Sequence, residues 1–62
     1  MTKQGVRSEI AKLESEIIGL TNYIQLKIKA KDWHAVSDAA NDIRELEMAI
    51  TVLRNIEGEV TV

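Results

Sequence analysis

The apolar residues of this chain recur at alternating steps of three and four residues, and this spacing constrains the fold more than any other feature. The first stripe consists of Val6, Ile10, Leu13, Ile17, Leu20 and Ile24. Steps of three and four keep one face of an α-helix apolar, whereas a half-buried strand would alternate at every second residue. The stripe predicts a helix over about residues 4–29.

A second stripe with the same spacing follows and predicts a second helix over about residues 33–57. It consists of Val36, Ala39, Ile43, Leu46, Ile50 and Leu53. Ala35, Ala49 and Ile56 widen this face beside the stripe, as expected for a helix that faces a core. The chain contains no proline that would break either helix.

The ends of the second helix carry residues typical of helix caps. Asp32 is a suitable N-cap, because its carboxylate can accept hydrogen bonds from the free N–H groups of the next turn. Gly58 is expected to close the second helix as the residue that follows its C-cap. The turn then comprises residues 30–32, and residues 58–62 form a tail that frays or docks on a neighbour.

Such a short connection makes the two helices antiparallel neighbours. Ala39 and Ala40 then fall opposite Ile24 and Tyr23, so that small residues face large ones. The sequence therefore predicts an all-α protein, a single antiparallel helical hairpin over residues 1–62.

A hairpin of this size is marginally stable alone and needs additional support. The chain has no cysteine for disulfides and one histidine, too few for a structural zinc site. Self-association remains, with a dimer that forms a four-helix bundle as the simplest arrangement and a trimer or larger ring as alternatives. Four apolar residues lie off the stripes and are expected to mediate it: Ile18, Leu26, Ile28 and Val52.

The charge balance and hydropathy argue against two classes of partner. Ten acidic against eight basic residues give a net charge of −2, which offers no general attraction to nucleic acid or anionic lipid. No apolar run approaches the ~20 residues of a membrane span, and the start of the chain lacks the apolar segment of a signal peptide. We expect a cytoplasmic protein.

Catalytic groups are not recognisable in the sequence. There is no cysteine nucleophile, no GxSxG, no HExxH and no P-loop. His34 next to Asp38 is too little for a catalytic zinc site, which needs three protein ligands. We expect a protein that is not an enzyme and that carries no cofactor or metal.

Seven residues near the predicted turn are candidates for binding: Trp33, His34, Asp38, Asp42, Tyr23, Lys27 and Lys31. Trp33 either covers the end of the core or stacks on a ligand, since tryptophan is enriched at binding hot spots. His34, Asp38 and Asp42 follow at steps of four along one flank. They form a solvated acidic flank, a patch for a cationic group or part of a metal site.

The lysines near the predicted turn also allow two interpretations. Lys27, Lys29 and Lys31 form the one basic cluster of the sequence. They lie where the first helix ends, and cations there complement the helix dipole. Gathered by oligomerisation, they could instead bind phosphate.

The segment DWHAVSDAANDIRELE, residues 32–47, resembles a motif in short phage and prophage helical proteins to which no activity is assigned. The resemblance implies a phage-encoded product that acts in the host cytoplasm. Small phage proteins of this kind are often host-takeover or anti-defence factors that bind a target and perform no chemistry.

Four functional hypotheses follow. The leading one is a non-enzymatic, self-associating binding protein with a protein target. The alternative is an oligomeric sponge that sequesters a small nucleotide-type signal in pockets between helices. The others are an RNA-binding bundle, similar in size and shape to the plasmid repressor-of-primer protein, and a purely structural subunit.

Overall fold

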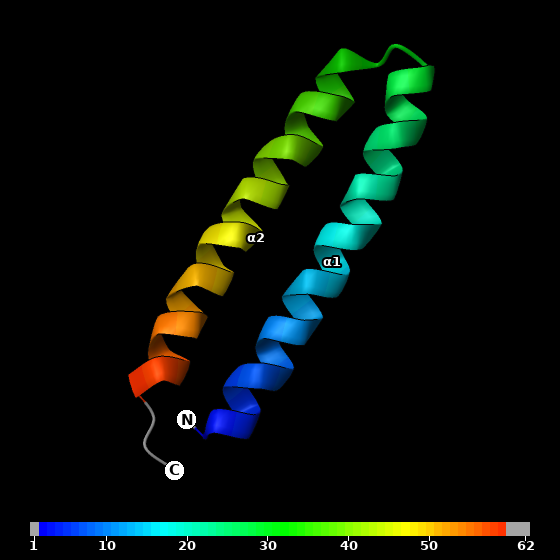
Figure 1. Ribbon diagram of the computed structural model, residues 1–62. Coiled ribbons are helices and arrows are strands. Elements are labelled where there is room, and N and C mark those ends of the chain that lie inside the picture. Colours follow the sequence, from blue (N-terminus) through cyan, green and yellow to red (C-terminus); the bar gives the residue numbers. More distant parts are fainter. Residues whose placement is uncertain (1, 60–62) are drawn as a thin grey trace.

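The computed structural model describes residues 2–59 of the chain, which form two helices joined by a short turn. Helix α1 spans Lys3–Lys29 and helix α2 spans Trp33–Glu59. The two helices run side by side in opposite directions, so the turn lies at one end and the start of α1 and the end of α2 lie at the other (Figure 1). The hairpin measures 48 × 14 × 11 Å. The predicted all-α antiparallel hairpin is confirmed.

The start of α1 is capped by a threonine. Thr2 has an extended backbone, and its Oγ1 accepts a hydrogen bond of 3.0 Å from the N–H of Gly5. Its carbonyl accepts the first helical hydrogen bond from the N–H of Val6. This cap satisfies donors that the first turn of a helix would otherwise leave free.

The end of α1 forms a Schellman motif with a lysine in the position that glycine usually occupies. Lys31 has a φ of 58°, in the left-handed region. Its N–H donates to the carbonyl of Ile28, and the N–H of Asp32 donates to the carbonyl of Lys27, both at 2.9 Å. These two bonds define the motif. The turn therefore reverses the chain within three residues.

Asp32 also begins α2. Its Oδ1 accepts a hydrogen bond of 3.2 Å from the N–H of Ala35, and its carbonyl accepts one of 3.1 Å from Val36. The predicted N-cap is confirmed. One residue therefore belongs to the caps of both helices.

The prediction that Gly58 ends the second helix is wrong. Helix α2 continues through Gly58 to Glu59, and no glycine of the described range has a positive φ. Glycine tolerates a helical backbone at about 1 kcal/mol relative to alanine. The last turn is also held across the hairpin, because Glu57 pairs with Arg7 at 2.8 Å. Of the predicted tail, residues 60–62 lie outside the described residues.

The interface between the helices follows the two apolar stripes, all of whose residues are buried or half-buried. Its buried residues are few: Val6, Ile10, Ala39 and Ile50. Three of them, Val6, Ile10 and Ile50, form a cluster at the end of the hairpin opposite the turn, which we call the open end. The half-buried residues that pack against this cluster are Leu13, Ile17, Leu53 and Ile56. Ala40 and Ala49, which we expected to face α1, are exposed. A helix with one neighbour buries a narrow stripe, and these two alanines lie beyond its edges.

Two ion pairs cross the rim of this interface. The Nε of Arg7 lies 2.8 Å from Glu57 Oε2, and a guanidinium nitrogen of Arg54 lies 3.1 Å from Glu14 Oε2. More than half of each arginine side chain is exposed, so each pair contributes at most about 1 kcal/mol. Their main effect is to favour one alignment of the two helices.

Replacing Lys31 by glycine is expected to stabilise the hairpin by about 0.5–1 kcal/mol. The left-handed backbone costs a non-glycine residue roughly 1–2 kcal/mol, and part of that gain is offset by the greater entropy of unfolded glycine. Urea unfolding followed by circular dichroism measures the change. The control is Lys12→Gly in the middle of α1, which should destabilise by about 1 kcal/mol. A destabilised Lys31→Gly variant would contradict the assigned turn.

Candidate functional site

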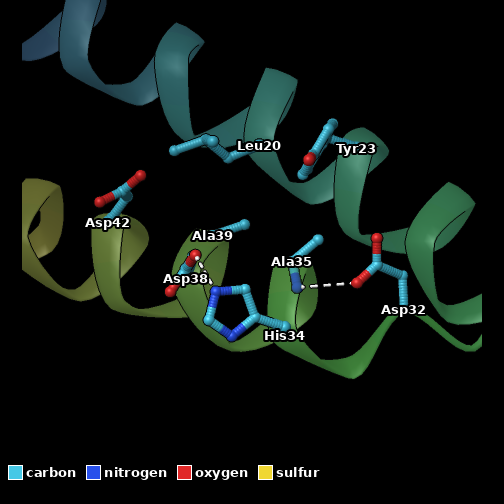
Figure 2. A pocket seen from close by; sticks show the side chains of 8 residues that line it. All are labelled: Leu20, Tyr23, Asp32, His34, Ala35, Asp38, Ala39 and Asp42. Carbon is cyan, nitrogen blue, oxygen red and sulfur yellow. Dashed lines mark hydrogen bonds and ion pairs between the residues drawn. The ribbon is translucent and has the colours of Figure 1, made fainter.

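A shallow hollow of about 420 Å³ lies between the helices near the turn. Figure 2 shows its lining, which comprises Leu20, Tyr23, Asp32, His34, Ala35, Asp38, Ala39 and Asp42. Helix α1 contributes the first two residues, the turn contributes Asp32 and α2 contributes the rest. The lining thus combines a small apolar floor with an acidic rim.

Small residues on α2 keep this hollow open. Ala39 is buried and Ala35 is half-buried, and both line the hollow together with Leu20 and Tyr23 of α1. An alanine fills less of the space between two helices than the leucine and isoleucines that face each other at the open end. The turn-proximal end of the hairpin is therefore the less filled one.

The rim of the hollow is acidic. The carboxylates of Asp32, Asp38 and Asp42 all line it, and no lysine or arginine does. His34 Nε2 lies 3.3 Å from Asp38 Oδ2, but these side chains are 91% and 70% exposed, so the contact adds little stability. Among residues 2–59, Asp42 makes no ion pair within 4 Å. The hollow is suited to a cationic group.

Tyr23 connects the hollow to a lysine on the same helix. The Nζ of Lys27 lies 5.3 Å from the centre of the Tyr23 ring, within the range of a cation–π interaction. The ammonium group covers one face of the ring, and the ring borders the hollow. Lys27 therefore lies beside the candidate site without lining it.

The structure brings together four of the seven residues that the sequence suggested for binding: Tyr23, His34, Asp38 and Asp42. Trp33 does not line the hollow, and 61% of it is exposed. It precedes His34 by one residue and so points about 100° away around the helix. Lys31 is also outside the hollow and serves the turn through its backbone.

One charged residue of the lining, Asp32, is not among the seven residues that the sequence suggests for binding. The sequence predicts Asp32 as a helix cap only, although a cap at the turn of a hairpin necessarily lies close to the end of the helix interface. The predicted position of the turn could therefore have placed Asp32 among the candidate binding residues. Leu20, Ala35 and Ala39 were predicted as interface residues, and they also form the floor.

The part of the chain that the structure describes holds no group of three histidine or acidic side chains that could bind a metal ion. His34 and Asp38 contact each other, but no third ligand joins them. Within that same range, neither helix combines the length and apolar character needed to cross a membrane.

The four residues suggested for self-association lie on two separate surfaces. Leu26 and Ile28 share a hollow of about 520 Å³ on α1 with Asn22, Gln25 and Lys29. Ile18 lies further along the same helix and is 63% exposed. Val52 is on α2, where it is 56% exposed.

Met48, which the apolar pattern did not single out, is 68% exposed and precedes Val52 by four residues on α2. That spacing places the two side chains on neighbouring turns of one helix face. Both helices thus carry exposed apolar residues, among them Ile18, Leu26 and Ile28 on α1 and Met48 and Val52 on α2.

Replacing Asp32 by alanine is expected to destabilise the hairpin by about 1 kcal/mol, because α2 loses its N-cap. Asp42→Ala is the matched control, since it also removes a carboxylate from the hollow. This control should leave stability unchanged or raise it by a few tenths of a kcal/mol, because like charges four residues apart repel. Equal effects of the two substitutions in urea unfolding would contradict the capping role.

Comparison of the chain with protein families, with curated proteins and with solved structures finds no match.

Proposed function

We propose that the chain is a non-enzymatic, self-associating binding protein that acts by holding a protein target. The observation that carries the proposal is the amount of apolar surface that the hairpin leaves uncovered. Within residues 2–59, seven large apolar residues are exposed, whereas three, Val6, Ile10 and Ile50, are buried. The exposed set is Ile18, Tyr23, Leu26, Ile28, Trp33, Met48 and Val52.

The total surface of the chain supports the same proposal. A compact folded monomer of 7.0 kDa exposes about 4,000 Å². This hairpin exposes 4666 Å². A standard protein interface buries about 800 Å² on each partner, so the excess of roughly 600 Å² is close to one side of such an interface.

The acidic hollow supports binding of a cationic group of the target. An arginine or lysine side chain would pair with Asp38 and Asp42 while its aliphatic part lies over Leu20 and Tyr23. Such a contact would also relieve the repulsion between the two aspartates. We therefore propose that the target presents a basic side chain at this hollow.

The biological setting of the proposal rests on the resemblance of residues 32–47 to phage and prophage proteins. In that setting the chain would be a phage product in the host cytoplasm, and its target a host protein such as a defence factor. The hollow and its acidic rim lie within this segment for the most part, because Asp32, His34, Asp38 and Asp42 all belong to it.

The nucleotide sponge is a weaker candidate because the hollow is lined by negative charges. Tyr23 and Lys27 offer stacking and a cation, but three carboxylates surround the space that a phosphate would have to enter. An RNA-binding bundle has the same difficulty, because α2 carries six acidic against two basic residues. A purely structural subunit leaves the hollow without a role.

The self-association is tested by native mass spectrometry of protein purified from its own host at low salt. We expect an oligomer, and we expect the midpoint of thermal unfolding to rise with protein concentration because assembly is linked to folding. A helical monomer at micromolar concentration, with a midpoint independent of concentration, would contradict the proposal.

The target is tested by affinity capture from host lysate with matched variants. A protein retained by the wild-type chain should be lost from the double variant Asp38→Ala, Asp42→Ala. The double variant Glu45→Ala, Glu47→Ala removes the same charge from α2 outside the hollow and should retain it. Equal retention by both variants would exclude the hollow as the binding site, and no specific retention by the wild type would exclude the proposed function.

The same variants separate the proposal from the sponge. A thermal-shift panel of cyclic nucleotides should leave the unfolding midpoint unchanged, because the acidic rim repels phosphate. A shift that disappears on Tyr23→Ala would favour the sponge. Binding to RNA in about 50 mM salt would favour the RNA-binding bundle, since such binding is strongest at low salt.

A further inference from the structure

The side of α1 that faces away from α2 carries a stripe without charges. Its members recur at steps of three and four, and all are exposed: Ser8, Ala11, Ser15, Ile18, Asn22 and Leu26. We call these six residues the outer stripe. Asn22 marks its position, because it lies two residues from both Leu20 and Ile24 and so about 200° around the helix from the interface.

The lack of charge on the outer stripe is unusual for a surface that faces water. Helix α1 carries five basic and three acidic residues, and none of them falls on the stripe between Ser8 and Leu26, although Lys29 follows Leu26 at the next step of three. From residue 17 to residue 26 the helix has no charged residue on any side. Ile18 and Leu26 are 63% and 66% exposed within this segment. Exposed helix faces usually carry charged residues, so a charge-free face with two exposed aliphatic side chains is a candidate for contact with another helix.

Gly19 lies beside the outer stripe in the middle of the uncharged segment. Glycine inside a helix costs about 1 kcal/mol relative to alanine. The hairpin itself does not require it, because a Cβ built at this position would meet nothing within 4 Å. A glycine would be required there if another helix approached the backbone of α1 closely.

The distribution of charge indicates which helix of a second copy fits this surface. Helix α1 has five basic and three acidic residues, a net +2, whereas α2 has two basic and six acidic residues, a net −4. Contact of α1 with another α1, or of α2 with another α2, would bring like net charges together. Contact of α1 with the α2 of a second copy repeats the opposite-charge pairing that exists inside the hairpin.

Helix α2 offers an apolar counterpart on its own far side. Met48 lies two residues from both Leu46 and Ile50, and so points about 200° away from the interface. Met48 and Val52 are 68% and 56% exposed. They are the exposed large apolar residues in the described part of α2, apart from Trp33 at its start.

We propose that the outer stripe of α1 packs against the far side of α2 of a second copy, around Met48 and Val52, with Gly19 at the closest approach. The proposal rests on the self-association proposed above and identifies the surfaces that would carry it. The proposed contact is head-to-tail, because it joins two different surfaces. Each copy therefore uses both surfaces, and the assembly closes into a ring or extends as a chain. A self-complementary four-helix dimer would instead use one surface twice.

The test uses two variants that each damage one surface. Leu26→Asp places a carboxylate on the outer stripe, and Met48→Asp places one on the far side of α2. Analytical ultracentrifugation should show each variant alone as a monomer. An equimolar mixture should form a one-to-one heterodimer, because each variant retains the surface that the other has lost. If a lone variant loses helicity, mixing should restore the circular dichroism signal.

Two results would overturn the proposal. One is that either variant alone assembles as the wild type does, which would place the interface elsewhere while leaving self-association intact. The other is that the mixture stays monomeric at concentrations at which the wild type assembles. A monomeric wild type would overturn both this inference and the self-association on which it rests.

A pair of glycine variants provides a readout that does not depend on a damaging substitution. Gly19→Ala and Gly58→Ala both add a methyl group to open space and both favour the helix. Gly19→Ala should weaken assembly at least tenfold in Kd, whereas Gly58→Ala should leave the Kd within about twofold. Equal assembly by the two variants would overturn the close approach at Gly19.

Discussion

A single apolar seam holds the two helices together, and the rest of the structure depends on how little that seam covers. Two helices in contact can shield one side of each other, so four of the residues in the described range are buried and the other side chains of that range remain half-buried or exposed. The hairpin therefore has a defined alignment but a small core. The same limitation leaves a hollow near the turn and apolar surface on both helices. A partner that covers this surface would add to the stability of so small a protein.

The residues of the seam could be predicted because they recur at a regular spacing that any short stretch of the sequence shows. Steps of three and four identify a helix face in any window of the sequence, and the cap at Asp32 is read from one residue and its neighbours. The end of α2 was not predictable in this way. Gly58 is a usual stop signal, but the ion pair between Arg7 and Glu57 joins the two termini of the hairpin. That contact exists in the folded chain and leaves no trace in the local sequence.

The candidate site was predictable in part for the same reason. His34, Asp38 and Asp42 lie one turn apart on one flank, and the antiparallel alignment brings Tyr23 to that flank. Trp33 was grouped with them through its place in the sequence, although one step along a helix turns a side chain by about 100°. Lys31 was suggested for binding because of its charge, but its role in the structure is the left-handed backbone conformation that the turn requires. The residue type alone predicts neither the direction of a side chain around the helix axis nor the backbone conformation of a residue.

The shared caps at the turn have a consequence for how a protein of this kind can change in evolution. Lys31 and Asp32 finish one helix and start the next with no residue to spare, so an insertion at the turn would break the hydrogen bonds of the shared caps and leave both helix ends less well satisfied. The open end carries no such constraint. Descendants of this chain should therefore differ in length there, through heptads gained or lost in matched pairs on the two helices, while the turn keeps its length.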